Sequence, residues 1–230
     1  MTIGQNLNDI QSLIDRALND ASRPANATQL VAVTKTKPAE DVQTALEAGH
    51  RVFGENRVQE AQEKFPDLKT AYPDLELHLI GPLQSNKTRD AVALFDVIQT
   101  VDRPKLIRHL VKAMAELDRK VACLIQVNTG SEPQKAGVEP QDLPDLLSTA
   151  KEEGLDVAGL MCIPPADQPA QPHFAFLAKL AQENGLVDGI LSMGMSGDFE
   201  QATRLGATHV RVGSAIFGGR PPLKPSPNKP

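Results

Sequence analysis

The sequence predicts a single (β/α)8 TIM-type barrel, and three observations lead to this fold class. Eight short apolar runs, each suited to one buried strand, alternate along the chain with helical patterns. The length of 230 residues is close to that of a small barrel of this type. An open doubly wound sheet shares the alternation, but no Gly-x-Gly-x-x-Gly fingerprint follows the first expected strand. The barrel is therefore the preferred fold.

An extra helix is expected before the barrel, because apolar side chains recur there on one helical face: Leu7, Ile10, Leu13, Ile14, Ala17 and Leu18. After this helix, short apolar runs rich in Val, Ile and Leu predict the strands. The eight expected strands cover residues 30–34, 51–54, 75–80, 96–100, 121–127, 156–161, 189–192 and 208–212.

Helices are expected between these strands, near residues 39–48, 57–70, 86–95, 103–118, 140–153, 170–184 and 197–205. Asp102, Arg103 and Pro104 form a good helix start, with a capping carboxylate and then a proline in the first turn. Glycines 49, 154, 185 and 206 fall just past helix ends, where a left-handed residue is favoured. One domain, residues 1–220, should hold all these elements, before a disordered Pro-rich tail over 221–230.

The composition points to a globular protein of the cytoplasm. Hydrophobic residues make up 40% of the chain and charged residues 23%, values typical of a protein with a real core. The two cysteines, Cys123 and Cys162, lie in apolar strand-like runs, which favours reduced thiols and a cytoplasmic location. No apolar run could span a membrane, and no signal pattern opens the chain, so no membrane contact is expected.

Charge and histidine spacing exclude two further classes of function. The net charge of −5 carries no nucleic-acid footprint, and an aromatic content of 3% leaves few side chains for base stacking. The histidines are scattered without metal-ligand spacing, so no metal site is predicted. Because no long apolar patch is evident, a monomer is expected.

Lys35 is the first candidate for chemistry. It follows the apolar run 30–34 and precedes Pro38, which places it at the carboxyl end of the first strand. Partial burial there would disfavour the ammonium form and leave more of the free amine that attacks a carbonyl. A solvated loop lysine is the simpler alternative for a lone lysine.

Two segments near the C-terminus provide the second part of the candidate site. Phosphate often binds after strands seven and eight of such barrels. Ser196 follows the seventh expected strand at a helix N-terminus, while Gly213 and Ser214 follow the eighth. Each segment alone also fits an ordinary strand-to-helix turn. A reactive lysine together with a phosphate cradle suggests a pyridoxal phosphate site.

Arg211 and Asn56 are further candidates. Arg211 alternates with Val210 and Val212, so it should point into the barrel, which is costly unless a partner receives its charge. That partner is either a glutamate or the pyridine nitrogen of a cofactor. Because an arginine keeps its proton, a pyridine nitrogen bound to it would stay unprotonated, and the cofactor ring would be a weak electron sink. Asn56 ends the second strand and either faces the same cavity or caps the next helix.

Five motifs in this order resemble those of the pyridoxal phosphate homeostasis protein family. They are LVAVTKTKP at 30–38, FGENRVQE at 53–60, HLIGPLQSNK at 78–87, MGMS at 193–196 and VRVGSAIFG at 210–218. The resemblance runs from about residue 5 to 220. Members of that family resemble the barrel half of bacterial alanine racemase, which implies a fold-type III barrel that binds pyridoxal phosphate.

The resemblance also implies roles for the six candidate residues. They would bind pyridoxal 5'-phosphate, with Lys35 as the Schiff-base lysine, Asn56 near the ring, Arg211 at the pyridine nitrogen, and Ser196, Gly213 and Ser214 around the phosphate. Relatives often have threonine in place of Ser214, and the serine keeps the hydroxyl. No residue is assigned a catalytic role.

A cofactor-binding protein is the function that the resemblance implies. It would hold and buffer pyridoxal phosphate in the cell, with apo pyridoxal phosphate-dependent enzymes as candidate recipients, and without strong catalysis of its own. The alternative is a pyridoxal phosphate-dependent racemase or decarboxylase. A racemase needs a base on each face of the substrate carbon. In the racemases that this chain resembles, the second base is a tyrosine of a C-terminal β-domain, and the chain is expected to end where that domain would start.

The single tyrosine, Tyr72, is not expected to replace that base, because it should lie in a loop on the far face of the barrel. A third interpretation is a Schiff-base aldolase that acts on a phosphorylated sugar. Lysines of such aldolases more usually lie on a later strand than the first, so this interpretation ranks last.

Overall fold

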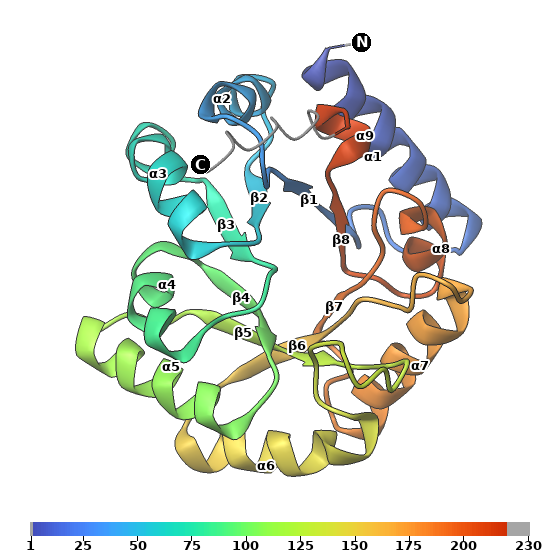
Figure 1. Cartoon of the computed structure of the whole chain (residues 1–230). Helices are drawn as coiled ribbons and strands as arrows, with labels where there is room; N and C mark the ends of the chain where they lie inside the picture. Colours follow the sequence, from blue (N-terminus) through green and yellow to red (C-terminus); the bar gives the residue numbers. More distant parts are fainter. Residues whose placement is uncertain (1, 220–230) are drawn as a thin grey trace, which may run out of the picture.

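The computed structural model describes residues 2–219, and its strands form the predicted closed barrel (Figure 1). The strands are parallel neighbours in chain order, and β8 pairs with β1 to close the barrel. Their bounds are β1 Gln29–Val33, β2 Val52–Glu55, β3 Glu76–Leu79, β4 Val97–Val101, β5 Ala122–Val127, β6 Val157–Cys162, β7 Ile190–Ser192 and β8 His209–Val212. Each observed strand overlaps its expected range, so the predicted fold class is confirmed.

Helices surround the strands on the outside (Figure 1). They are α1 Ile3–Asp20, α2 Ala39–Glu47, α3 Val58–Ala71, α4 Thr88–Leu94, α5 Pro104–Leu117, α6 Leu143–Glu153, α7 Ala170–Glu183, α8 Phe199–Arg204 and α9 Ser214–Phe217. Two 3-10 turns, η1 Ser85–Lys87 and η2 Pro140–Asp142, precede α4 and α6. The sequence did not predict α9, because a helix of 4 residues is too short to show a period. The predicted tail, 221–230, lies outside the described residues.

The predicted extra helix, α1, begins with a capping box. The Thr2 hydroxyl accepts from the Gln5 amide, and the Gln5 side chain accepts from the Thr2 amide. Its expected apolar face is buried at Leu7, Ile10 and Ile14, and packs beside α8 and α9. The helix therefore covers the seam where the last strand meets the first.

Of two predicted helix signals, the structure contradicts the N-terminal cap at Asp102 and confirms the glycines that follow helix ends. Pro104 opens α5 as expected, but the residue before it is Arg103, and no side chain caps this helix. Asp102 lies one residue too early to cap and forms an ion pair with Arg103 instead, so the predicted capping carboxylate was wrong. Glycines 49, 154, 185 and 206 all have positive φ angles, from 76° to 104°, which confirms their predicted left-handed positions.

The core has two parts because strand side chains alternate between the faces of the sheet. Side chains such as Ile98, Cys123 and Leu160 belong to the large cluster between the strands and the helices. Their neighbours Val97, Leu124 and Met161 point the other way and form a small separate cluster inside the barrel. The rest of the barrel interior is more polar, and it leads to the candidate site.

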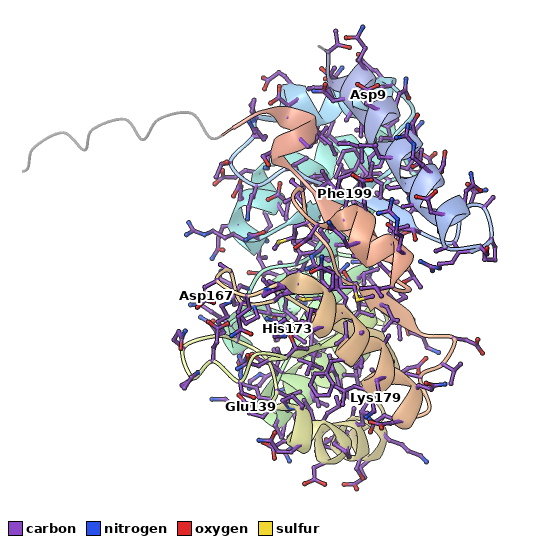
Figure 2. All side chains as sticks on the ribbon, turned by 90° about the vertical axis from the view of Figure 1, so that its right-hand side faces the viewer. Asp9, Glu139, Asp167, His173, Lys179 and Phe199 are labelled. Atoms are coloured by element: carbon purple, nitrogen blue, oxygen red, sulfur yellow. The ribbon has the colours of Figure 1, made fainter. Side chains whose placement is uncertain are left out.

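The loops that follow the strands gather at one end of the barrel. Figure 2 shows Asp167, in the loop after β6, at one side of the molecule, whereas Lys179, further along α7, lies toward the other. Functional residues of such barrels lie at the end where the strands finish. The cavity described below lies at this end.

Gly159 provides a test of how tightly β6 and β7 pack. A Cβ at Gly159 would lie 2.0 Å from the Ile190 carbonyl oxygen and 2.5 Å from its nitrogen. Because this neighbour is backbone, Gly159→Ala should push the paired strands apart and lower the free energy of unfolding by about 2–3 kcal/mol in urea denaturation. Gly219→Ala, where no atom lies within 4 Å of the new Cβ, is the control. A loss below about 0.5 kcal/mol for Gly159→Ala would contradict the close packing.

Candidate functional site

The six predicted site residues line one cavity at the carboxyl ends of the strands. Its volume is about 420 Å³, which is within the range of small-molecule sites. The lining includes the whole predicted set: Lys35, Asn56, Ser196, Arg211, Gly213 and Ser214. The structure thus brings together residues from the ends of β1, β2, β7 and β8, while their binding roles remain predictions.

Closure of the barrel places the Lys35 segment against the end of β8. Ala32 of β1 pairs with Val212 of β8. One residue further along, a Cβ at Gly213 would lie 3.1 Å from the Val33 carbonyl oxygen. The absence of a side chain at Gly213 therefore lets the two strand ends approach each other. Lys35, two residues beyond Val33, is half-buried in the wall of the cavity.

A buried ion pair between α3 and the end of β2 supports the turn that carries Lys35. The Lys64 ammonium, on α3, lies 2.5 Å from the Glu55 carboxylate at the end of β2. The same ammonium donates to the carbonyl oxygens of Thr34, at 2.9 Å, and Lys37, at 3.1 Å, on either side of Lys35. Lys64 thereby ties the ends of β1 and β2 together and holds the turn that carries Lys35.

Glu55 is fully buried, and burial raises the pKa of its carboxyl group, although Lys64 and the Thr34 hydroxyl act in the opposite direction. The Thr34 hydroxyl donates to Glu55 Oε1 at 2.7 Å, and Oε2 has no hydrogen-bond partner within residues 2–219. The sequence alone did not reveal the Glu55–Lys64 pair. The available signal was a glutamate directly after the buried residues of an expected strand.

Ser196 lies in a loop rather than at a helix N-terminus. The helix α8 begins at Phe199, and the Asp198 carboxylate accepts from the Met195 amide at 2.6 Å within the preceding turn. The predicted helix-end position of Ser196 was therefore wrong, because this turn delays the helix. The Ser196 hydroxyl instead accepts from the Gly213 amide at 3.4 Å, which connects the loop after β7 to the loop after β8.

The loop after β8 leads directly into α9. Ser214 is the first residue of this helix and is exposed at the cavity edge, and Gly213 precedes it. Barrels of this type often bind phosphate with the loops after strands seven and eight and a short extra helix. A Cβ at Gly197 would meet no atom within 4 Å, so the segment beside Ser196 leaves open space.

Arg211 points into the barrel, as predicted, and is 4% exposed. It donates through Nη1 to the Ser192 hydroxyl at 2.7 Å and through Nη2 to the Cys162 carbonyl oxygen at 2.8 Å. Within residues 2–219 it forms no ion pair, so the glutamate partner considered from the sequence is not present. Burial lowers the pKa of the guanidinium. An arginine carries five N–H donors, so several remain for the cavity that Arg211 lines.

A chain of buried hydrogen bonds leads from Arg211 to the other end of the barrel. The Ser192 hydroxyl donates to Gln99 Oε1 at 2.6 Å, and Gln99 Nε2 donates to His78 Nδ1 at 2.7 Å. His78 Nε2 then donates to Glu76 Oε1 at 2.7 Å. Every donor points the same way, which assigns the neutral His78 tautomer with its proton on Nε2. The sequence signal for these hydrogen bonds was the presence of polar residues at inward positions of four otherwise apolar strands, β3, β4, β7 and β8.

Asn56 lines the cavity and does not cap α3. The helix begins at Val58, and the residue before it, Arg57, makes no side-chain cap. The helix-cap interpretation of Asn56 was therefore wrong. Four apolar side chains line the same cavity and provide its hydrophobic walls: Val33, Ile80, Ile163 and Met195.

Two other residue classes complete the description. Cys123 and Cys162 are free and buried, and burial raises the pKa of each thiol to about 12, which makes both unreactive. In residues 2–219, no group of three or more His, Cys, Asp or Glu side chains is placed to hold a metal ion. No helix in this range combines the length and the apolar character needed to cross a membrane.

Comparisons with known proteins agree in fold and family. The family model described as "Alanine racemase, N-terminal domain" matches residues 6–221. The Pasteurella multocida relative named "Pyridoxal phosphate homeostasis protein" is 42% identical, over 96% of this chain and 98% of its own length. The Vibrio cholerae relative of the same name is 43% identical, over 95% of this chain and 97% of its own length.

A solved structure shares this architecture. PipY of Synechococcus elongatus, with pyridoxal phosphate bound, is 39% identical and covers 94% of this chain and 100% of its own, with a TM-score of 0.81. The structure of PipY without pyridoxal phosphate gives a TM-score of 0.82 at the same identity.

His209 should make the stability of the protein depend on pH. Burial and the nearby positive charge of Arg211 lower the pKa of His209 to about 4, from an ordinary value of 6.5. The unfolded chain therefore binds more protons between these values, and the stability from neutral His209 is complete above pH 6.5 and lost as the pH falls toward 4. We expect wild-type protein to lose about 2–3 kcal/mol over this window in urea denaturation, and His209→Gln to lose much less. Equal losses in both proteins would contradict the assignment.

Gln99 tests the buried chain of hydrogen bonds. Gln99→Leu keeps the approximate volume but leaves the Ser192 O–H without an acceptor and His78 Nδ1 without a donor. We expect the free energy of unfolding to fall by about 2–3 kcal/mol, because unpaired buried polar groups are costly. Gln43→Leu is the control, since Gln43 is exposed and, within residues 2–219, its side chain bonds only Glu47 on the same helix. A similar loss in both variants would show that the buried chain adds nothing to stability.

Proposed function

The chain belongs to the pyridoxal phosphate homeostasis protein family, within the alanine racemase N-terminal domain family, and from this premise we propose that it binds pyridoxal 5'-phosphate as a Schiff base with Lys35. The proposed site is the cavity at the carboxyl ends of the strands. Pyridoxal phosphate carries an aldehyde, a ring nitrogen and a phosphate, so a fitting cavity needs three different partners at its edges.

The observation that carries the proposal is the state of Arg211. A buried guanidinium without a carboxylate partner favours a ligand that brings an acceptor, because two neutral hydrogen-bond partners compensate only part of the desolvation of its charge. The pyridine nitrogen of the cofactor is such an acceptor. The remaining N–H donors of Arg211 are available in the same cavity as Lys35.

The other two ends of the cofactor also have suitable partners. The Ser196 and Ser214 hydroxyls offer hydrogen-bond donors for a phosphate. Ser214 begins α9, and Gly213 before it carries no side chain that would keep the phosphate from this backbone. The Lys35 amine is held at the cavity wall by the Lys64-supported turn. When bound, the cofactor supplies an aldehyde carbon that this amine attacks.

The walls fit the remainder of the cofactor. Ile80, Ile163 and Met195 offer apolar contact for the ring, and we place the Asn56 amide near it. Part of the lining is exposed, including Ser214, Gly197 and Met195, so water and other amines can reach the site. An accessible site suits a protein that takes up and releases its cofactor.

We further propose that the protein holds the cofactor without strong catalysis of its own. The titratable side chains among the described lining residues are Lys35, Lys37 and Arg211. The Lys37 ammonium donates to the carbonyl oxygens of Phe217 and Gly219, and an arginine keeps its proton. Tyr72 stacks under Arg51 instead of lining the cavity. A racemase or decarboxylase would need a second acid–base group, and the described lining residues offer no further candidate for it.

The same proposal includes the cellular compartment and the oligomeric state of the protein. Free buried thiols suit a reducing compartment, which supports action in the cytoplasm. We propose a monomer that passes pyridoxal phosphate to apo pyridoxal phosphate-dependent enzymes, because an accessible cavity allows the cofactor to leave.

Covalent mapping tests the proposed function. Purified protein would be mixed with pyridoxal phosphate, reduced with borohydride and mapped by peptide mass spectrometry. We expect the adduct on Lys35, no adduct at this position in Lys35→Ala, and wild-type labelling in the control Lys105→Ala, which removes an exposed lysine of α5. An adduct spread over surface lysines would reject the site.

The same preparation tests the absence of strong catalysis. Incubated with L-alanine, the protein should form D-alanine no faster than free pyridoxal phosphate does. Formation at the rate of a racemase would favour the enzyme alternative.

A further inference from the structure

A second groove adjoins the proposed cofactor cavity. It has a volume of about 760 Å³ and lies between the junction of β2 with α3 and the loop after β3. Its lining residues are Asn56, Arg57, Val58 and Gln59 from the first and Pro82, Leu83, Gln84 and Lys87 from the second. Asn56 lines both the groove and the cavity, so the two spaces meet at this side chain. We call this space the loop groove. Two motifs found in the sequence, 53–60 and 78–87, supply all of its lining, and of these lining residues the proposed cofactor contacts use Asn56 alone.

The backbone of the loop groove is held firmly in place. A Cβ at Gly81 would lie 2.2 Å from the Asn56 carbonyl oxygen, so the two loops are in direct backbone contact. The Thr100 hydroxyl donates to the Gly81 carbonyl oxygen and Arg103 Nη2 donates to that of Leu83, each at 2.9 Å. The groove therefore exists before any ligand arrives, which lowers the entropic cost of binding.

The lining combines an apolar floor with polar side chains. Val58 and Leu83 are 5% and 3% exposed and belong to the main core. Above them lie four amide or cationic side chains that make no hydrogen bond or ion pair within residues 2–219: Asn56, Arg57, Gln59 and Gln84. All four can donate hydrogen bonds to a ligand without breaking an internal contact.

The charge of the loop groove is positive. Arg57 and Lys87 line it, and no carboxylate is among its lining residues. The Lys87 ammonium forms an ion pair with the Asp90 carboxylate at 3.2 Å, whereas Arg57 forms no ion pair within the described residues. Glu55 and Glu60, the two acidic residues nearest to Arg57 in sequence, are both paired with Lys64. A guanidinium with free donors matches the planar, bidentate geometry of a carboxylate.

We propose that the loop groove binds the carboxylate of a small amino acid whose amine takes the cofactor from Lys35. This inference rests on the proposed function, because it names the class of molecule that releases the cofactor. Arg57 and the amides would hold the carboxylate, and the amine would face the cavity past Asn56. The apolar floor at Val58 and Leu83 would accept a short aliphatic side chain.

The transfer is balanced without any further reactant. The amine nitrogen forms a new C=N bond to the cofactor carbon, and the bond between that carbon and Lys35 Nζ breaks. The two protons of the attacking amine pass to Lys35 Nζ, which leaves as a free amine. No electrons are gained or lost, so no oxidant or reductant is needed.

Release rates test the proposal on the cofactor-loaded protein. Glycine and glycinamide carry the same amine, but only glycine carries a carboxylate. With rates corrected for the fraction of free amine, glycine should release the cofactor from the wild type about tenfold faster than glycinamide, as expected for one charge-assisted contact. Arg57→Gln should abolish this preference, and Arg57→Lys should restore part of it. Arg89→Gln, at an exposed cation of α4 outside the groove, should keep the preference.

A second measurement uses no cofactor. Propionate, a carboxylate without an amine, would be titrated into cofactor-free protein and followed by amide chemical shifts. We expect saturable shifts at residues of the loop groove, with affinity reduced about tenfold in Arg57→Gln. Unchanged propionate binding in this variant, or an unchanged preference for glycine, would overturn the groove proposal. Failure of pyridoxal phosphate to label Lys35 would instead reject the proposed function, so the two failures are distinguishable.

Discussion

Closure of the barrel by pairing β1 with β8 is the constraint on which the rest of the site depends. The pairing sets Val31 beside Arg211 and Ala32 beside Val212. Beyond the last pair, Gly213 lies directly against Val33. A Cβ added at Gly213 would already be in tight contact with Val33. The turn that carries Lys35 thus meets the loop that carries Ser214. Residues from opposite ends of the chain share one cavity only because the sheet closes.

Two buried cations, Lys64 and Arg211, have different partners, and each contributes to the cavity. Lys64 is neutralised by Glu55, and this pair supports the turn around Lys35. Arg211 has hydrogen-bonded neutral partners instead, and its charge is left for a ligand to complement. A guanidinium does not give up its proton, so a ring nitrogen bound to Arg211 would stay unprotonated and the ring would be a weak electron sink. This agrees with the proposal of a protein that stores the cofactor and exchanges it at an accessible edge.

The sequence by itself determined the fold class, the order of the strands and six residues that line one cavity. These features follow from local signals. Hydrophobic periodicity predicts the strands and helices, and the carboxyl ends of the strands in a parallel barrel all lie around one cavity. Lys35, Arg211 and Ser214 could be placed in a common site for this reason, without any knowledge of contacts. The inward direction of Arg211 followed from simple alternation with Val210 and Val212.

Only the tertiary structure decided which side chains touch. The pairing of Glu55 with Lys64, the contact of Ser196 with Gly213 and the chain through Gln99 all join residues on different elements, so no local pattern contains them. Tertiary context also shifted the start of α8 beyond Ser196, because the turn closed by Asp198 competes with the helix. Hydrogen bonds and ion pairs depend on distances of a few tenths of an ångström, which closure of the barrel sets and a linear pattern does not encode.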